Sequence, residues 1–220
     1  TTVYQPTTEG NATLMFRRGS TTNQSLNAAS IDSLDLVNLR IENNANVATS
    51  SNFTIREAIQ LAGPNDRLIA SNGYITFQPG ANDVLGWDVF PGAILRLWNV
   101  DVIQESGGGV AMEPKGNIEV QGDFTKSGTD DFNYTVNGGE VKFYGANQKT
   151  LTNAGGAGDL TFDILRVLPG ASVVTSTDWV VENEIDVQTG ASLKANNGQI
   201  IVSGAAALIK NASTQTLEFY

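Results

Sequence analysis

The chain contains no cysteine and no histidine among its 220 residues. Without cysteine it has no disulfides, no thiolate nucleophile and no cysteine-ligated metal. Without histidine it lacks the usual general base of a Ser-His-Asp triad and the commonest ligand of transition metals. These two absences remove the most familiar forms of nucleophilic and metal-dependent catalysis, and they favour a protein that is not an enzyme.

Charge and long apolar runs are also scarce. Charged residues make up 16% of the chain and acidic ones dominate, so the net charge is −10. An acidic surface repels nucleic-acid phosphates and anionic lipids, whose binding depends on clustered Lys and Arg. The longest apolar run, residues 205–209, is far shorter than the roughly 20 residues of a spanning helix. We expect no nucleic-acid partner and no membrane insertion. Because the chain begins at Thr1, we also expect that processing or trimming removed a preceding segment.

What the sequence does contain is an internal repeat. Residues from Leu34 onward match those from Leu160 onward at an offset of 160 − 34 = 126, in an ordered series over about 65 positions. Residues 39–41 match 165–167, for example, and residues 53–55 match 179–181. The pattern predicts two copies of a unit of about 125 residues. The first is residues 1–116, with an extra segment at 82–113, and the second is residues 117–220, truncated; together they form one continuous stack.

A shorter period lies inside each copy. The dipeptide Gly-Ala recurs just before apolar residues, at positions 80, 92, 170, 190 and 204. Gly170 and Gly190 are 20 residues apart, close to the length of one coil of a parallel β-helix. Glycine suits a tight corner where φ is positive, and the apolar residue that follows can begin a strand that faces inward.

Strand periodicity supports the same fold. In residues 179–187, Trp179, Val181, Ile185 and Val187 fall on one face of a period-two pattern. Glu57 and Asn183 place a polar residue at the same inward phase in the two copies, and we interpret that position as a corner between two short strands. The predicted fold class is all-β, a parallel β-helix or β-solenoid with little or no helix.

Three segments resemble a known family. Residues 118–128 (IEVQGDFTKSG), 139–145 (GEVKFYG) with Gln148, and 160–167 (LTFDILRV) occur in this order. The order is similar to repeats of large secreted surface proteins of Bacteroidota, the adhesin-like β-solenoids exported by the type IX pathway. The resemblance covers residues 117–204 well and 9–80 more loosely, whereas residues 82–113 fit no standard coil. It implies secretion and a role at the cell surface or in a filament, and it carries no catalytic residues.

Acidic and aromatic residues provide candidate binding sites. Glu182, Glu184 and Asp186 form a row that could bind Ca²⁺, a cation that favours several oxygen ligands, although a solvated outer face is the favoured explanation of the row. Trp87 and Trp98 could stack on sugar rings, with Phe90 and Tyr74 nearby in the sequence; the alternative is that these aromatics belong to the core. No other cofactor is expected.

Two further sets of residues bear on catalysis. A pair drawn from Asp101, Asp123, Asp130 and Asp131 could act in glycoside hydrolysis, although loop carboxylates are common. Arg40 and Arg166 hold equivalent places in the two copies and could serve as the base of a polysaccharide lyase. The alternative is that each is an outward strand residue whose stem covers neighbouring apolar surface.

Three functions are compatible with these observations. The first is a non-enzymatic, self-associating structural or adhesive module of an extracellular surface protein or filament, whose partners are itself, neighbouring repeats or glycans. The second is a β-helical polysaccharide lyase or hydrolase. The third is a segment of a phage tail fibre or spike, which predicts a trimer. The lack of histidine and the duplicated core favour the first.

Overall fold

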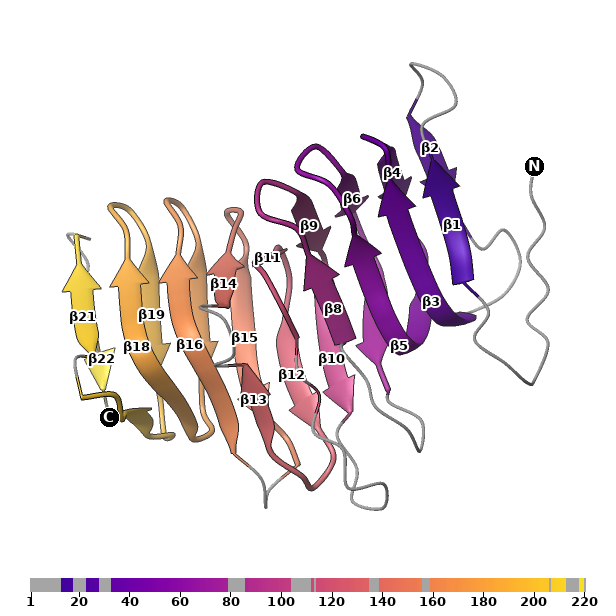
Figure 1. Ribbon diagram of the computed structural model, residues 1–220. Coiled ribbons are helices and arrows are strands. Elements are labelled where there is room, and N and C mark those ends of the chain that lie inside the picture. The colour runs from indigo at the N-terminus through magenta and orange to yellow at the C-terminus, as the bar shows by residue number, and fades with distance from the viewer. Residues whose placement is uncertain are drawn as a thin grey trace.

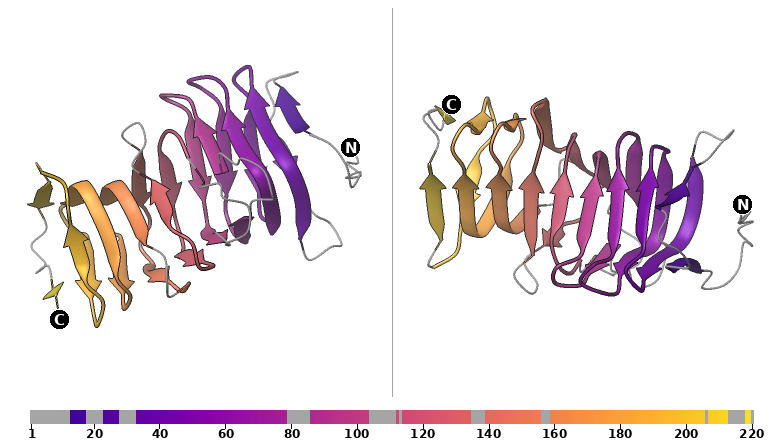
Figure 2. Two further views of the ribbon diagram at one scale, coloured as in Figure 1. Left: turned by 60° about the horizontal axis from the view of Figure 1, so that its bottom comes forward. Right: turned by 90° about the horizontal axis from the view of Figure 1, so that it is seen from above.

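The computed structural model describes residues 13–17, 23–27, 33–78, 86–103, 112, 114–134, 139–155, 159–205, 207–212 and 218–219. Within these ranges the chain forms 22 strands and no helix, and so no helix able to cross a membrane. Every recorded strand pairing is parallel. The strands stack as the coils of a β-solenoid, with the first and last coils at opposite ends (Figures 1 and 2). The predicted fold class is confirmed.

The strands line three parallel ladders, because the longest strands each contribute to two of them. The first ladder contains β2 (Gln24–Leu26), β4 (Asn46–Thr49), β6 (Arg67–Ala70), β9 (Ile94–Leu97), β11 (Ile118–Val120), β14 (Glu140–Phe143), the second halves of β16 (Leu160–Val167) and β18 (Trp179–Val187), and β21 (Leu208–Asn211). The second ladder contains the first halves of β3 (Leu34–Glu42) and β5 (Phe53–Leu61), then β7 (Tyr74–Phe77), β10 (Asn99–Ile103), β12 (Phe124–Ser127), β15 (Gln148–Asn153), β17 (Ser172–Thr175), β19 (Ser192–Ala195) and β22 (Glu218–Phe219).

The third ladder is recorded in two runs. The first run contains β1 (Thr13–Arg17), the second halves of β3 and β5, and β8 (Gly86–Val89), and the second contains β13 (Phe132–Tyr134), the first halves of β16 and β18, and β20 (Ile200–Val202). The coil after β8 contributes a single bridge, from Asp88 to Lys115. Backbone pairing in the described part of this ladder is therefore thinnest in the middle of the stack.

A β-bulge marks the point at which a long strand passes from one ladder to the next. Leu36 is opposite Ile55 and Asn38 is opposite Ala58, so β5 has two residues between these pairs where β3 has one. The same shift separates β16 from β18, around Asn183. The structure therefore differs from the predicted corner between two short strands, because each polar residue lies in a bulge of one nine-residue strand.

The two matched regions share this bulge but occupy different ladders. The first half of β3 lies in the second ladder, whereas the first half of its sequence match β16 lies in the third. The offset of 126 residues thus moves each matched strand on by one ladder, and the duplication itself stays a prediction. The strand β11 is hydrogen-bonded to β9 and β14, so the stack is continuous across residues 116 and 117.

The described part of residues 82–113 belongs to the stack, because β8, β9 and β10 fall within it and pair with strands before or after. That this segment is extra relative to the second unit stays a prediction. Residues 82–85, 104–111 and 113 lie outside the described residues.

The core is a column of inward-facing apolar side chains. In β18 the side chains of Trp179, Val181, Ile185 and Val187 are all at most 1% exposed, as the alternation predicts. Successive coils place like residues on top of one another, and the second ladder stacks Leu34, Phe53, Ile75, Val100, Phe124 and Leu151. A single coil could not bury such residues, so the stacking of neighbours provides the core.

Glycine corners set the coil length. Ser172 and Ser192 are register partners and the Gly170 N–H donates to the Gly190 carbonyl at 3.2 Å, so the 20-residue spacing is one coil, as predicted. Gly92, Gly170 and Gly190 all have positive φ, which residues with a Cβ adopt at a cost.

Alanine substitutions at two glycines should have unequal effects. Gly170 and Gly116 both have a φ of 82°, but a Cβ at Gly170 would meet nothing within 4 Å, whereas one at Gly116 would lie 2.1 Å from the Val89 carbonyl oxygen. Gly170→Ala should lower the free energy of unfolding by about 1 kcal/mol, from backbone strain alone. Gly116→Ala should cost at least about twice as much. Chemical denaturation of the two variants checks this; equal losses would contradict it.

Candidate functional site

The first ladder carries a column of charged side chains on its outer side. Its members are register partners on successive coils: Arg96, Glu119, Lys142, Arg166, Asp186 and Lys210. Adjacent strands of a sheet are about 4.8 Å apart, so the end of each side chain reaches the next coil. The signs of the charges mostly alternate along the column, and the side chains form ion pairs.

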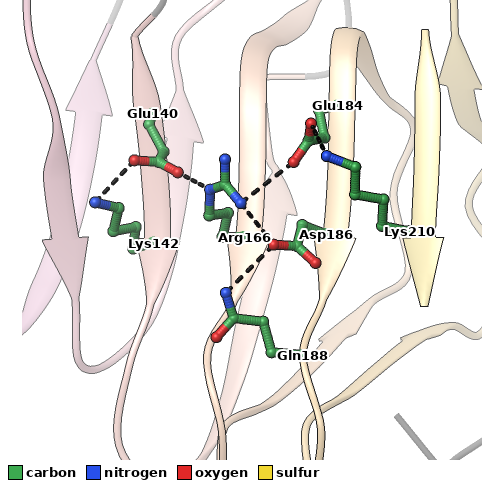
Figure 3. A network of polar contacts seen from close by, with 7 residues as sticks. All are labelled: Glu140, Lys142, Arg166, Glu184, Asp186, Gln188 and Lys210. Atoms are coloured by element: carbon green, nitrogen blue, oxygen red, sulfur yellow. Dashed lines mark hydrogen bonds and ion pairs between the residues drawn. The ribbon is translucent and has the colours of Figure 1, made fainter. Parts of the chain in front are cut away.

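Arg166 lies at the centre of this network (Figure 3). Its Nε donates to Glu140, and one terminal nitrogen lies 2.6 Å from Asp186 and 3.2 Å from Glu184. Glu140 also accepts from Lys142 at 2.8 Å, and Glu184 accepts from Lys210 at 2.7 Å.

Glu140 corrects the one break in the alternation of the column. Lys142 and Arg166 are like-charged neighbours on adjacent coils, which alone would be destabilising. Glu140 is two residues before Lys142 on the same side of β14, and its two oxygens bind one cation each. The seven residues of Figure 3 therefore join β14, β16, β18 and β21 through side chains as well as through the backbone.

These ion pairs are partly shielded from water. The side chain of Arg166 is 28% exposed, while those of Glu140 and Asp186 are only 10% and 12% exposed. Ion pairs in such positions are screened less by salt than fully exposed ones, and losing one partner leaves a costly charge. The arrangement can stabilise the stack; its charged groups are directed at each other.

Two of the three predicted Ca²⁺ ligands lie in this network. Glu184 and Asp186 are bound to Arg166 and Lys210, while Glu182 lies in the bulge and has no register partner. Within the described residues, no group of three or more Asp, Glu, His or Cys is placed to hold a metal ion. A Ca²⁺ ion at Glu184 and Asp186 would have to displace two cations, and this site stays a prediction.

The two predicted sugar-stacking tryptophans differ in their exposure. Trp87 is fully buried in the core, so its assignment as a carbohydrate contact is wrong. Its ring lies 5.1 Å from that of Phe77 and 5.2 Å from that of Tyr134, edge to face. Trp98 is partly buried and packs against the core. Tyr74 and Phe90 are exposed.

Three of the four candidate catalytic aspartates, Asp101, Asp123 and Asp131, form hydrogen bonds between coils. Asp123 accepts from the backbone N–H of Thr150, and Asp131 from that of Asp159, at 2.7 and 2.8 Å. Asp101 accepts from the Ser127 hydroxyl at 2.8 Å, and burial raises the pKa of its carboxyl despite this bond. Neither Asp101 nor Asp123 pairs with a second carboxylate, and both bind the next coil.

Arg40 and Arg166 occupy the outer side of different ladders. Arg40 lies in the third ladder, where its Nε donates to Glu42 at 2.9 Å. Arg166 lies in the first ladder, within the network described above. Both positions fit the outward strand residue that the sequence left as an alternative.

Two buried lysines were not anticipated. Lys149 is 1% exposed, and its ammonium donates to the carbonyl oxygens of Gly145 and Asn147 at 2.6 and 2.5 Å. Lys126 is also buried, with Asp131 among the acidic groups that favour its charged form. Burial lowers the pKa of both amines. Both occupy inward strand phases, a signal visible in sequence only once the strand limits are known.

Comparison with known proteins found no match: no protein-family model, no curated protein and no solved structure is significantly similar to this chain.

Proposed function

We propose that this chain is a non-enzymatic structural or adhesive module of an extracellular surface protein or filament. The observation that carries the proposal is the charged column of the first ladder. Its cations and carboxylates pair from coil to coil around Arg166 and are not directed at a shared open site. The resemblance of residues 117–204 to secreted β-solenoid repeats supports the extracellular assignment. A module of this kind adds length and exposed surface to the protein or filament that contains it. Its partners are other copies of the same chain, neighbouring repeats or glycans.

The proposal is tested by incubating the purified chain with uronic-acid and neutral polysaccharides, with Ca²⁺ or with a chelator. We expect no release of reducing ends and no unsaturated product, because a lyase needs a free base beside its substrate, and Arg166 is bound by three carboxylates. Antibody labelling of intact producing cells checks the surface location; label that appears only after permeabilisation contradicts it.

If oligosaccharides are released, the Arg166→Met variant distinguishes a lyase that uses Arg166 from the structural module proposed above. Release of oligosaccharides that Arg166→Met abolishes and Arg56→Met preserves would establish the lyase and end the structural proposal. Arg56 is a matched control, since it also pairs with a carboxylate, that of Asp35, but lies outside the network.

A further inference from the structure

Large apolar side chains are exposed at the two ends of the stack. Met15 in β1 is 40% exposed, and Ile201 in β20, Leu208 and Ile209 in β21 are 44, 47 and 48% exposed. These strands lie at opposite ends of the molecule (Figure 1). Exposed apolar groups on a strand edge are typical of a surface that associates with another strand.

Among the described residues, the first and last strands of the third ladder are each paired along one edge only. In the part of the chain that the structure describes, β1 pairs only with β3, and β20 pairs only with β18. The opposite edge of each strand presents backbone N–H and C=O groups to which a further strand can bond.

The strands β1 and β20 have the same alternation of inward and outward apolar side chains. In β1, Leu14 and Phe16 are partly buried against the core and Met15 points outward. In β20, Ile200 and Val202 are partly buried against the core and Ile201 points outward. A parallel pairing of the two strands places three apolar residues on three apolar residues, without charge and with inward positions on inward positions. Cross-strand pairs of this kind stabilise a sheet.

The order of the ladders extends the match beyond one strand. The first coil visits the third, first and second ladders through β1, β2 and β3, and the last coil visits them in the same order through β20, β21 and β22. A second copy placed on the last coil therefore brings β1 to β20, β2 to β21 and β3 to β22. A partner without this order of strands could pair with one ladder only.

We infer that the partner of these edges is a second copy of this chain, docked head to tail so that β1 of one copy continues the third ladder of the other after β20. The inference rests on the proposed structural function and specifies its partner. The two surfaces differ, so the contact is heterologous and repeats along the axis, which generates an open filament in place of a closed oligomer.

Lysine substitutions at the two ends test the inference. The full chain and the variants Met15→Lys and Ile201→Lys are compared by sedimentation velocity over a range of concentrations and by electron microscopy. We expect linear oligomers of the unaltered chain that lengthen with concentration. Each variant alone should associate several-fold more weakly, because the lysine replaces the apolar contact between Met15 of one copy and Ile201 of the other with a contact to a hydrated ammonium. Both sites are exposed, and circular dichroism checks that the variants fold.

Mixing the two variants gives the decisive result. Met15→Lys keeps an intact last coil and Ile201→Lys keeps an intact first coil, so an equimolar mixture should form one-to-one dimers and nothing longer. Tyr74→Lys, at an exposed position away from both ends, should assemble like the unaltered chain.

Other results overturn the inference. A monomer at every concentration, a trimer of fixed size, or oligomers that persist in either single variant would each exclude the head-to-tail contact. These outcomes are distinct from failure of the proposed function, which is decided by the turnover of polysaccharides and by the surface labelling.

Discussion

Replacing Trp87 with alanine should lower the free energy of unfolding by about 4 kcal/mol, within the range measured for large aromatic residues in cores. Its side chain is fully buried, and its ring contacts those of Phe77, Tyr134 and Phe132 at centroid distances of 5.1 to 5.9 Å. Three aromatic rings from other strands flank the indole, so its removal leaves a cavity in the middle of the core. Guanidinium denaturation followed by circular dichroism measures the loss.

Phe90→Ala is the matched control for Trp87→Ala. Phe90 directly follows β8 and is 47% exposed, so its removal should change the stability by no more than about 0.5 kcal/mol. Equal stability of Trp87→Ala and the unaltered chain would show that the ring does not hold the core together. Loss of glycan binding without loss of stability would restore the carbohydrate assignment.

The fold was predictable because its two strongest signals are local. Alternation in residues 179–187 predicts which side chains face inward without knowledge of any neighbouring strand. Gly170 and Gly190 mark corners because positive φ favours glycine, and their separation is the length of one coil. Both signals depend on short stretches of chain, which a single sequence contains in full.

The errors concern which strand lies beside which. Pairing of parallel strands depends on register between segments that are 20 or more residues apart, and a bulge shifts that register by one residue. A corner at Glu57 and a bulge at Glu57 would give the same pattern of polar and apolar residues in the sequence. The sequence alone therefore does not distinguish the two structures. Residues 82–113 match no segment of the second copy in sequence, and only the pairing of β8, β9 and β10 with other strands shows that their described part belongs to the coils.

The site was less predictable than the fold, because it consists of pairs between coils. The sequence shows Glu184 and Asp186 as an acidic row and Arg166 as a separate candidate, but only the register of β16 against β18 brings them together. Trp87 shows the opposite case: an aromatic residue in a Gly-rich region fits a sugar platform and a core equally well. Burial, which decides between them, is a property of the whole stack.

The same register explains why the charges of the first ladder do not weaken the solenoid. Stacking coils in register places identical positions about 4.8 Å apart, so a repeat that carried one sign of charge at this position would repel itself along the axis. The chain avoids this by changing the sign of charge at most coils and by placing Glu140 beside the two cations, Lys142 and Arg166, that follow one another. Arg166 takes part in three of these ion pairs, with Glu140, Glu184 and Asp186.

Arg166→Met should therefore destabilise the stack by about 2–3 kcal/mol at low ionic strength, since it retains the apolar stem and leaves partly buried carboxylates without their shared cation. The loss should shrink at high salt, which screens the remaining repulsion. Denaturation at two salt concentrations measures both effects. Arg56→Met should cost no more than about 1 kcal/mol, because Arg56 and Asp35 are 38% and 55% exposed.

A double variant distinguishes electrostatic repulsion from lost packing. Asp186→Asn removes one of the carboxylates that Arg166 binds at 2.6 Å. If the charge pairing stabilises the coils, the loss in Arg166→Met with Asp186→Asn will be smaller than the sum of the two single losses, by about 1 kcal/mol or more. Additive losses, or a loss in Arg166→Met that salt does not change, would mean that the arginine acts through its stem. The network of the first ladder would then have no electrostatic role in joining the coils.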